Sequence, residues 1–115
     1  LAPEDTDWNR IVALYDALLR CLPSPVVALN RAVAVSMAAG PEAALPLVDA
    51  LAGEAKLANY HLLPGVRGDL LFRLGRYAEA RAEFERAAGL TANARERELL
   101  VARAARCLEM AAAAG

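Results

Sequence analysis

The stretch "RLGRYAEARAEFERAAGL", Arg73 to Leu90, decides the fold class of this chain. After its glycine, small side chains and one aromatic recur at helical spacing, with Ala80, Phe84 and Ala87 on one face. This pattern is typical of an amphipathic helix whose apolar face packs on a neighbour. No residue in the stretch suggests a catalytic group.

The remainder of the chain favours helices as well. Its 115 residues are rich in Ala, Leu, Arg and Glu, which lose little rotamer freedom in a helix. Glycines and prolines divide it into segments joined by few residues, so neighbouring segments are expected to run antiparallel. Thr6 is a suitable N-cap for the first segment, and Pro46 is expected to bend or delay the third. The six segments comprise residues 7–21, 26–39, 41–53, 60–75, 77–89 and 93–110. We therefore expect one all-α domain over residues 1–115.

The spacing of Ala80, Phe84 and Ala87 recurs in two earlier segments. The intervening segments share an arginine followed by a small residue, and these arginines recur 36 residues apart. The first series comprises Ile11, Tyr15 and Leu18 in the first segment, and Ala44, Val48 and Leu51 in the third. The second series comprises Arg31, Arg67 and Arg103. Alternating helices with a period of about 34 residues are the signature of a helical-hairpin solenoid.

In its details the repeat resembles the tetratricopeptide repeat. That motif has a small residue in its first helix, a glycine–x–aromatic turn, and small, aromatic and small residues in its second helix. One continuous copy matches it, through Gly68, Gly75, Tyr77, Ala80, Phe84 and Ala87. The other copies are degenerate, because no aromatic residue follows Gly40 and no terminal proline follows Leu90. The resemblance implies a tetratricopeptide-like helical-hairpin solenoid of about six helices in a right-handed stack.

A narrower resemblance covers nearly the whole chain. The chain is similar to the C-terminal extension of a group of bacterial extracytoplasmic-function sigma factors, in which tetratricopeptide-like helices follow the two sigma regions. The matching segments are "PEDTDWNRIVALYDALL", "SPVVALNRAVAVSMAAGPEAAL" and "YHLLPGVRGDLLFRLGRYAEARAEFERAAGLTANARERELL". The chain departs from the family pattern at Gly65 and Gly68, where the family favours alanine.

This resemblance implies a non-catalytic regulatory domain that acts in transcription initiation. Its protein partners would be the sigma regions of the parent chain, RNA polymerase or a regulator. Promoter recognition would belong to the sigma regions upstream, because no segment of these 115 residues resembles the regions that read promoters or bind polymerase. The alternative is a free-standing tetratricopeptide-type adaptor that holds a peptide in its concave groove, and the upstream sequence of the intact gene product would separate the two.

Other functions fit the sequence less well. Thirteen basic and fourteen acidic side chains leave the chain nearly neutral, which disfavours direct nucleic-acid binding. A helix-turn-helix would present Arg, Lys, Asn and Gln on one exposed face, and no segment does so. An enzyme is disfavoured because the single histidine, His61, has no Ser, Cys or carboxylate pattern around it. We therefore expect no catalytic residue, no cofactor and no metal site.

The expected location is the cytoplasm. No apolar run reaches the length of about 18 residues that a membrane span needs, and no signal peptide is recognisable. Cys21 and Cys107 are expected to be free buried thiols in a reducing compartment. The run "RERE", Arg95 to Glu98, is expected to form a solvated face with ion pairs inside its own helix.

Acids and arginines alternate along the chain in an order that predicts ion pairs between helices. An acid directly follows the large core residue in the second helix of each repeat, and an arginine lies in each intervening helix. The acids are Asp16, Asp49 and Glu85, and the arginines are Arg31, Arg67 and Arg103. We expect at least two of these arginines to pair with acids of this set as a structural ladder, because a carboxylate satisfies a guanidinium that is costly to bury alone. The alternative is that the arginines face the groove and bind the carboxylates of a partner.

The segment that begins at Asp7 has the pattern of the second helix of a hairpin. Helical repeats bury their apolar faces on neighbouring helices. Apolar side chains of this segment, Ile11 or Leu18 among them, are therefore expected to be partly uncovered or covered by another copy of the chain. Self-association through this truncated N-terminal face is thus an expected property.

Overall fold

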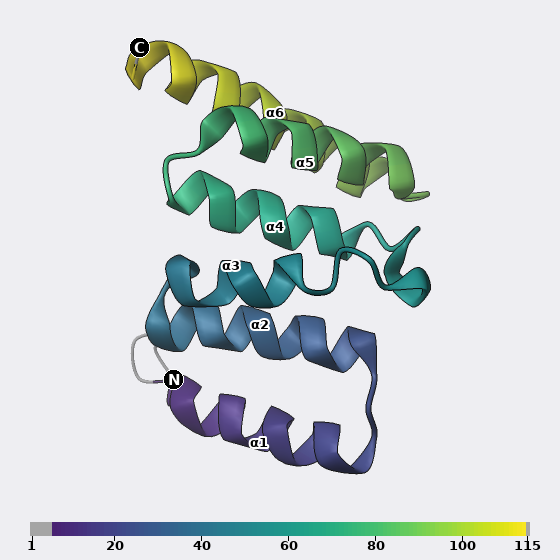
Figure 1. The fold of residues 1–115 in the computed structure, drawn as a ribbon. Coiled ribbons are helices and arrows are strands. Elements are labelled where there is room, and N and C mark those ends of the chain that lie inside the picture. Colours follow the sequence, from purple (N-terminus) through teal and green to yellow (C-terminus); the bar gives the residue numbers. More distant parts are fainter. Residues whose placement is uncertain (1–5, 115) are drawn as a thin grey trace.

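The computed structural model describes residues 6–114, and over this range it contains six α-helices, one short 3-10 helix and no strand (Figure 1). The expectation of an all-α chain with six main helices is therefore confirmed. The helices are α1 (Trp8–Cys21), α2 (Pro25–Ala39), α3 (Pro41–Asp49), α4 (Leu62–Arg73), α5 (Tyr77–Leu90) and α6 (Ala94–Ala114), and the 3-10 helix η2 (Ala55–Leu57) precedes α4.

Short polar side chains and glycine determine several helix boundaries. Asp7, and not Thr6, caps α1, because its carboxylate accepts the backbone N–H three residues later. Ser24 and Asn93 make the same contact at the starts of α2 and α6. Gly75 separates α4 from α5 with a φ of 77°, a left-handed conformation that glycine adopts without strain.

Pro46 lies inside α3 and does not delay it, because α3 begins at Pro41. Proline has no N–H to donate to the helix ladder and crowds the preceding turn. α3 is the shortest of the α-helices and ends at Asp49, so the expected continuation to residue 53 is wrong. The chain then passes through η2 before α4 begins.

Consecutive helices lie side by side and alternate in direction, from α1 at one edge of the molecule to α6 at the other (Figure 1). The described part of the chain is elongated, with extents of 43 × 32 × 26 Å. In addition to its sequence neighbours, α2 contacts α4, which brings alternate helices together on one side of the molecule. None of the helices in residues 6–114 is both long and apolar enough to cross a membrane.

The apolar face that the stretch Arg73 to Leu90 predicted lies on α5 and packs in the core. Ala80, Phe84 and Ala87 are 0%, 2% and 0% exposed, which confirms their expected burial. A Cβ atom added at Gly68 of α4 would lie only 2.9 Å from ring atoms of Phe84. The missing side chain at Gly68 therefore allows α4 and the aromatic ring of α5 to approach closely.

Gly65 and Gly68 form a matched pair of test positions within α4. Gly65→Ala is expected to raise the free energy of unfolding by about 0.5–1 kcal/mol, because alanine favours a helix and a new Cβ there meets nothing within 4 Å. Gly68→Ala gains the same preference, but it displaces the buried Phe84 ring, and overpacking a core costs about 1–3 kcal/mol. We expect a net loss of about 1 kcal/mol in urea denaturation. Equal stabilisation by both substitutions would contradict the close approach at Gly68.

α1 is the least covered helix, because none of its residues is fully buried. Leu14 and Leu18 lie four residues apart and so share one stripe of α1, and Leu22 follows directly after the end of the helix. They are 61%, 42% and 58% exposed, whereas Ile11 is half-buried. Apolar side chains of α1 are thus uncovered, as the sequence predicted.

The two cysteines are free thiols in different surroundings. Cys107 of α6 is buried, and burial raises the pKa of its thiol above the ordinary value. Cys21 is exposed at the end of α1, so the expected burial of both thiols is wrong for this residue. The reason is the sparse cover of α1 as a whole.

Candidate functional site

Two of the expected arginine–acid pairs join consecutive helices. Nε of Arg31 in α2 donates a hydrogen bond to Oδ1 of Asp16 in α1. In the same way, Nε of Arg67 in α4 donates to Oδ1 of Asp49 in α3, at 2.7 Å. Both arginine side chains are about three-quarters covered, at 28% and 25% exposed. Each guanidinium is thus used within the fold.

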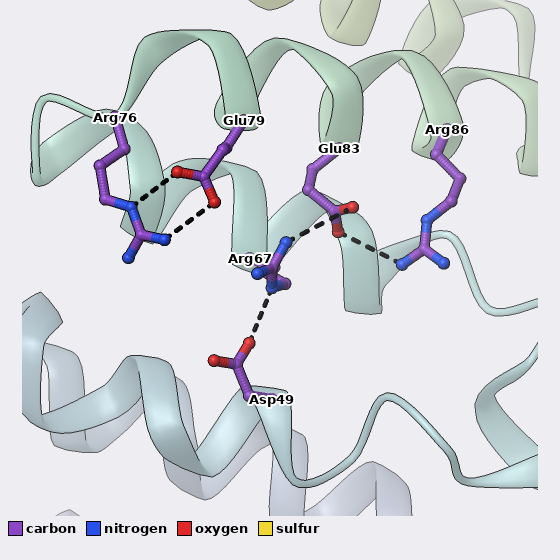
Figure 2. A network of polar contacts seen from close by, with 6 residues as sticks. All are labelled: Asp49, Arg67, Arg76, Glu79, Glu83 and Arg86. Atoms are coloured by element: carbon purple, nitrogen blue, oxygen red, sulfur yellow. Dashed lines mark hydrogen bonds and ion pairs between the residues drawn. The ribbon is translucent and has the colours of Figure 1, made fainter.

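Arg67 also belongs to a larger network that reaches α5, as Figure 2 shows. Its Nη1 atom lies 3.6 Å from Oε1 of Glu83, whose side chain is only 13% exposed. Oε2 of Glu83 in turn lies 3.2 Å from Nη2 of Arg86 on the same helix. Arg67 therefore links α3, α4 and α5.

A separate pair at the start of α5 is local. Nε and Nη2 of Arg76 donate to the two carboxylate oxygens of Glu79 at 2.9 and 2.8 Å (Figure 2). These hydrogen bonds lower the pKa of Glu79 and raise that of Arg76, since each stabilises the charged form of its partner. Both side chains are exposed, so the pair organises the first turn of α5 without joining helices.

Two of the three arginines thus pair as expected, and a third pair, between Arg103 and Glu85, does not form. Oε2 of Glu85 lies 3.5 Å from Nη2 of Arg81 on the same helix. No acid in residues 6–114 lies within ion-pair distance of Arg103. Glu85 lies about one and a half turns before the end of α5, whereas Arg103 lies about two and a half turns after the start of α6. Because the connection between these helices is tight, positions unequally distant from it are not opposite each other. Glu85 borders Val101 on one side of α6, and Arg103 faces the other side, toward α4.

An open groove runs along the side formed by α2, α4 and α6. Its larger part, about 340 Å³, has apolar walls from all three helices, formed by Val33, Leu62, Val66 and Leu99 among others. Val33, Leu62 and Leu99 are 36%, 40% and 52% exposed. Exposed apolar side chains gathered in a concavity are typical of a binding surface. We refer to this feature as the α2–α4–α6 groove.

Polar groups lie toward both ends of the α2–α4–α6 groove. His61 and Glu96 line it near the starts of α4 and α6, and Asp69 and Arg103 line it further along the same helices. There the groove meets a second pocket of about 280 Å³, which Asp69 and Arg103 share and to which Phe72 contributes an aromatic ring. The groove thus combines an apolar middle with charged groups.

His61 has a partner that sequence reasoning missed. Its Nε2 atom lies 2.9 Å from Oε1 of Glu96, and this contact joins the start of α4 to α6. The two residues are 35 positions apart, close to one repeat period. Pairing polar residues one period apart would have indicated this contact. Among the described residues, no group of three or more His, Cys, Asp or Glu side chains is placed to hold a metal ion.

The charged run at the start of α6 makes contacts outside its own helix. Arg97 donates to the carbonyl oxygens of Ala88 and Thr91 at 3.3 and 2.8 Å, near the end of α5. Glu96 accepts hydrogen bonds from the Thr91 hydroxyl and pairs with His61. The expectation of ion pairs within the run is wrong for these two residues, because carbonyls at the end of a helix lack intrahelical donors and attract the arginine.

The comparison with known proteins finds a relative without an assigned function. The chain is 57% identical over 94 residues to an uncharacterized protein of Rhizobium meliloti (strain 1021). These residues are 82% of this chain but 22% of the relative, so the chain spans about a fifth of the relative's length. No family model matches the chain, and no solved structure matches it.

Proposed function

We propose that this chain is a non-catalytic regulatory and protein-interaction domain of a bacterial extracytoplasmic-function sigma factor. It acts in transcription initiation in the cytoplasm, by contacting the sigma regions of its parent chain, RNA polymerase or a regulator. One observation carries the proposal: the segments similar to the sigma-factor extension supply most of a continuous series of antiparallel helices (Figure 1). Four of the motif residues, Gly68, Ala80, Phe84 and Ala87, are buried in that series, whereas Tyr77 is half-buried and Gly75 is exposed.

The helices are proposed to form a right-handed, tetratricopeptide-like solenoid. In this arrangement α2–α3 and α4–α5 are successive hairpins, and α1 is the second helix of a preceding one. The close approach of Gly68 and Phe84 supports the pairing of α4 with α5, because the motif places a small residue and an aromatic at these positions. The α2–α4–α6 groove supports it too, since the first helices of successive hairpins line the concave face of a solenoid.

The sigma-factor proposal is tested with the full-length Rhizobium meliloti relative. We expect this protein to co-elute with core RNA polymerase in size-exclusion chromatography and to support promoter-specific transcription in a reconstituted reaction. Deleting the region that matches this chain is expected to change the yield of specific transcript. A relative that neither binds core polymerase nor supports transcription would refute the sigma-factor assignment. The groove would then favour the alternative, a peptide-binding adaptor.

We further propose that the uncovered face of α1 binds a second copy of this chain. The exposed leucines Leu14, Leu18 and Leu22 are expected to drive concentration-dependent self-association of the 115-residue chain, because their burial removes apolar surface from water. Sedimentation velocity measures the dimer fraction. Replacing Leu14 and Leu18 by glutamate should shift the chain to monomer, whereas Ala13→Glu, an exposed position away from the stripe, should not. A wild-type chain that stays monomeric at high concentration would refute the proposal.

A further inference from the structure

The three arginines that recur along the chain do not have the same role. Arg31 and Arg67 are paired with Asp16 and Asp49, and both guanidinium groups are largely covered. Arg103 is exposed and has no acid within ion-pair distance among residues 6–114. It lines both pockets of the α2–α4–α6 groove at the point where they meet. The structure thus leaves one of the three positive charges available in a concave surface.

The other charged groups around the α2–α4–α6 groove have partners within the chain. Oδ2 of Asp69 lies 3.7 Å from Nη1 of Arg73, which is one turn further along α4. Nη1 of Arg106 lies 3.3 Å from Oε2 of Glu109, and both residues belong to α6. Glu96, toward the start of α6, contacts His61. Arg103 is therefore the charge that a bound molecule would complement.

We propose that the α2–α4–α6 groove binds an acidic, apolar protein segment whose carboxylate pairs with Arg103. This inference rests on the proposed role as a protein-interaction domain and names the chemistry of the partner. Leu99, which is 52% exposed, precedes Arg103 by one helical turn, or about 6 Å along α6. A helix lying along α6 presents an apolar residue and an acid at the same four-residue spacing. The acid receives the planar guanidinium fork, and the apolar residue packs on Leu99 and Leu62.

The test uses two fluorescein-labelled helical peptides made of Ala, Leu and one charged residue type. The first peptide carries Leu and Glu four residues apart, and the second has Lys in place of each Glu. Fluorescence anisotropy at low salt is expected to show that the wild-type chain binds the Glu peptide about tenfold more tightly than the Lys peptide. Arg103→Glu is expected to reverse this order, because the charge in the groove changes sign.

Arg10→Glu is the matched control. Arg10 is exposed on α1, at the opposite edge of the molecule from α6, and its replacement changes the net charge by the same amount (Figure 1). This variant should keep the wild-type preference, and circular dichroism melting should show that both variants are folded. The proposal is overturned if the wild-type chain binds neither peptide or both equally. It is also overturned if Arg103→Glu keeps the preference for the Glu peptide.

A failure of the groove proposal can be distinguished from a failure of the sigma-factor proposal. If deleting the domain from the full-length parent protein alters transcription while Arg103→Glu leaves the peptide preference unchanged, the inference about the groove fails and the sigma-factor role stands. If the deletion has no effect on transcription while Arg103→Glu reverses the preference, the sigma-factor role fails and the chemistry of the groove stands.

Discussion

Replacing Phe84 by alanine is expected to lower the free energy of unfolding by about 3–5 kcal/mol, the range found for large aromatic truncations in protein cores. Phe84 is 2% exposed and packs among the fully buried Ala80 and Ala87 on α5. On α4, it lies against Gly68, which has no side chain to move into the space left by the ring. The cavity therefore stays open, and the substitution loses both the transfer free energy of the ring and its packing contacts.

Guanidinium denaturation with a tryptophan or helix signal measures this change. Phe84→Leu is the graded control, because it keeps most of the apolar volume and is expected to cost less than half as much as the alanine substitution. Leu108→Ala, on the exposed side of α6, should change stability by only a few tenths of a kcal/mol. A Phe84→Ala loss as small as that of Leu108→Ala would show that the α4–α5 hairpin does not pack around this ring.

Replacing Arg67 by alanine is expected to cost about 2 kcal/mol, the second-largest of the expected stability effects. The substitution leaves Glu83, which is 13% exposed, with Arg86 as its remaining partner and removes the contact of α4 with Asp49. It also removes the aliphatic stem of a side chain that is only 25% exposed. Arg76→Ala is the control, because its pair with Glu79 is exposed and local, and we expect no detectable change there.

Double-mutant cycles separate the two partners of Arg67. The pair with Asp49 is shorter, at 2.7 Å, but Asp49 is 48% exposed, so its coupling is expected to be about 0.2–1 kcal/mol. The pair with Glu83 is longer, at 3.6 Å, yet the carboxylate is better covered and less screened, and we expect a coupling of about 1 kcal/mol or more. Couplings near zero, together with lost partner binding by Arg67→Ala, would instead make Arg67 part of the binding site.

The existence and order of the helices could be predicted from the sequence, and their exact limits only in part. Ala-rich composition and apolar spacing indicate helices wherever glycine and proline do not interrupt them. The limits depend on single contacts that compete closely. Asp7 replaces Thr6 as the cap of α1, and α3 ends soon after Pro46. The burial of the Phe84 face was predictable, because its spacing already places three residues on one side of a helix.

The ion pairs were predictable only where the geometry of the connections happened to agree with the repeat. Arg31 and Arg67 meet the acids that their positions in the repeat suggest. Arg103 has the same spacing to Glu85 as Arg67 has to Asp49, and yet it faces another helix. The contact between His61 and Glu96 was not expected at all, because neither residue has a local pattern that points to the other.

The sequence by itself determined that this chain is helical, because helix formation depends on hydrogen bonds and apolar contacts between residues three and four positions apart. It also determined which face of α5 is apolar and which residue of α4 is small enough to pack against it. Only the tertiary structure decided that His61 meets Glu96, that Arg103 does not meet Glu85, and that the charge of Arg103 is left in the α2–α4–α6 groove. The reason is physical: an ion pair requires two side chains to point to the same place, and the direction of each depends on the length of the connections and on the rotation of each helix about its axis.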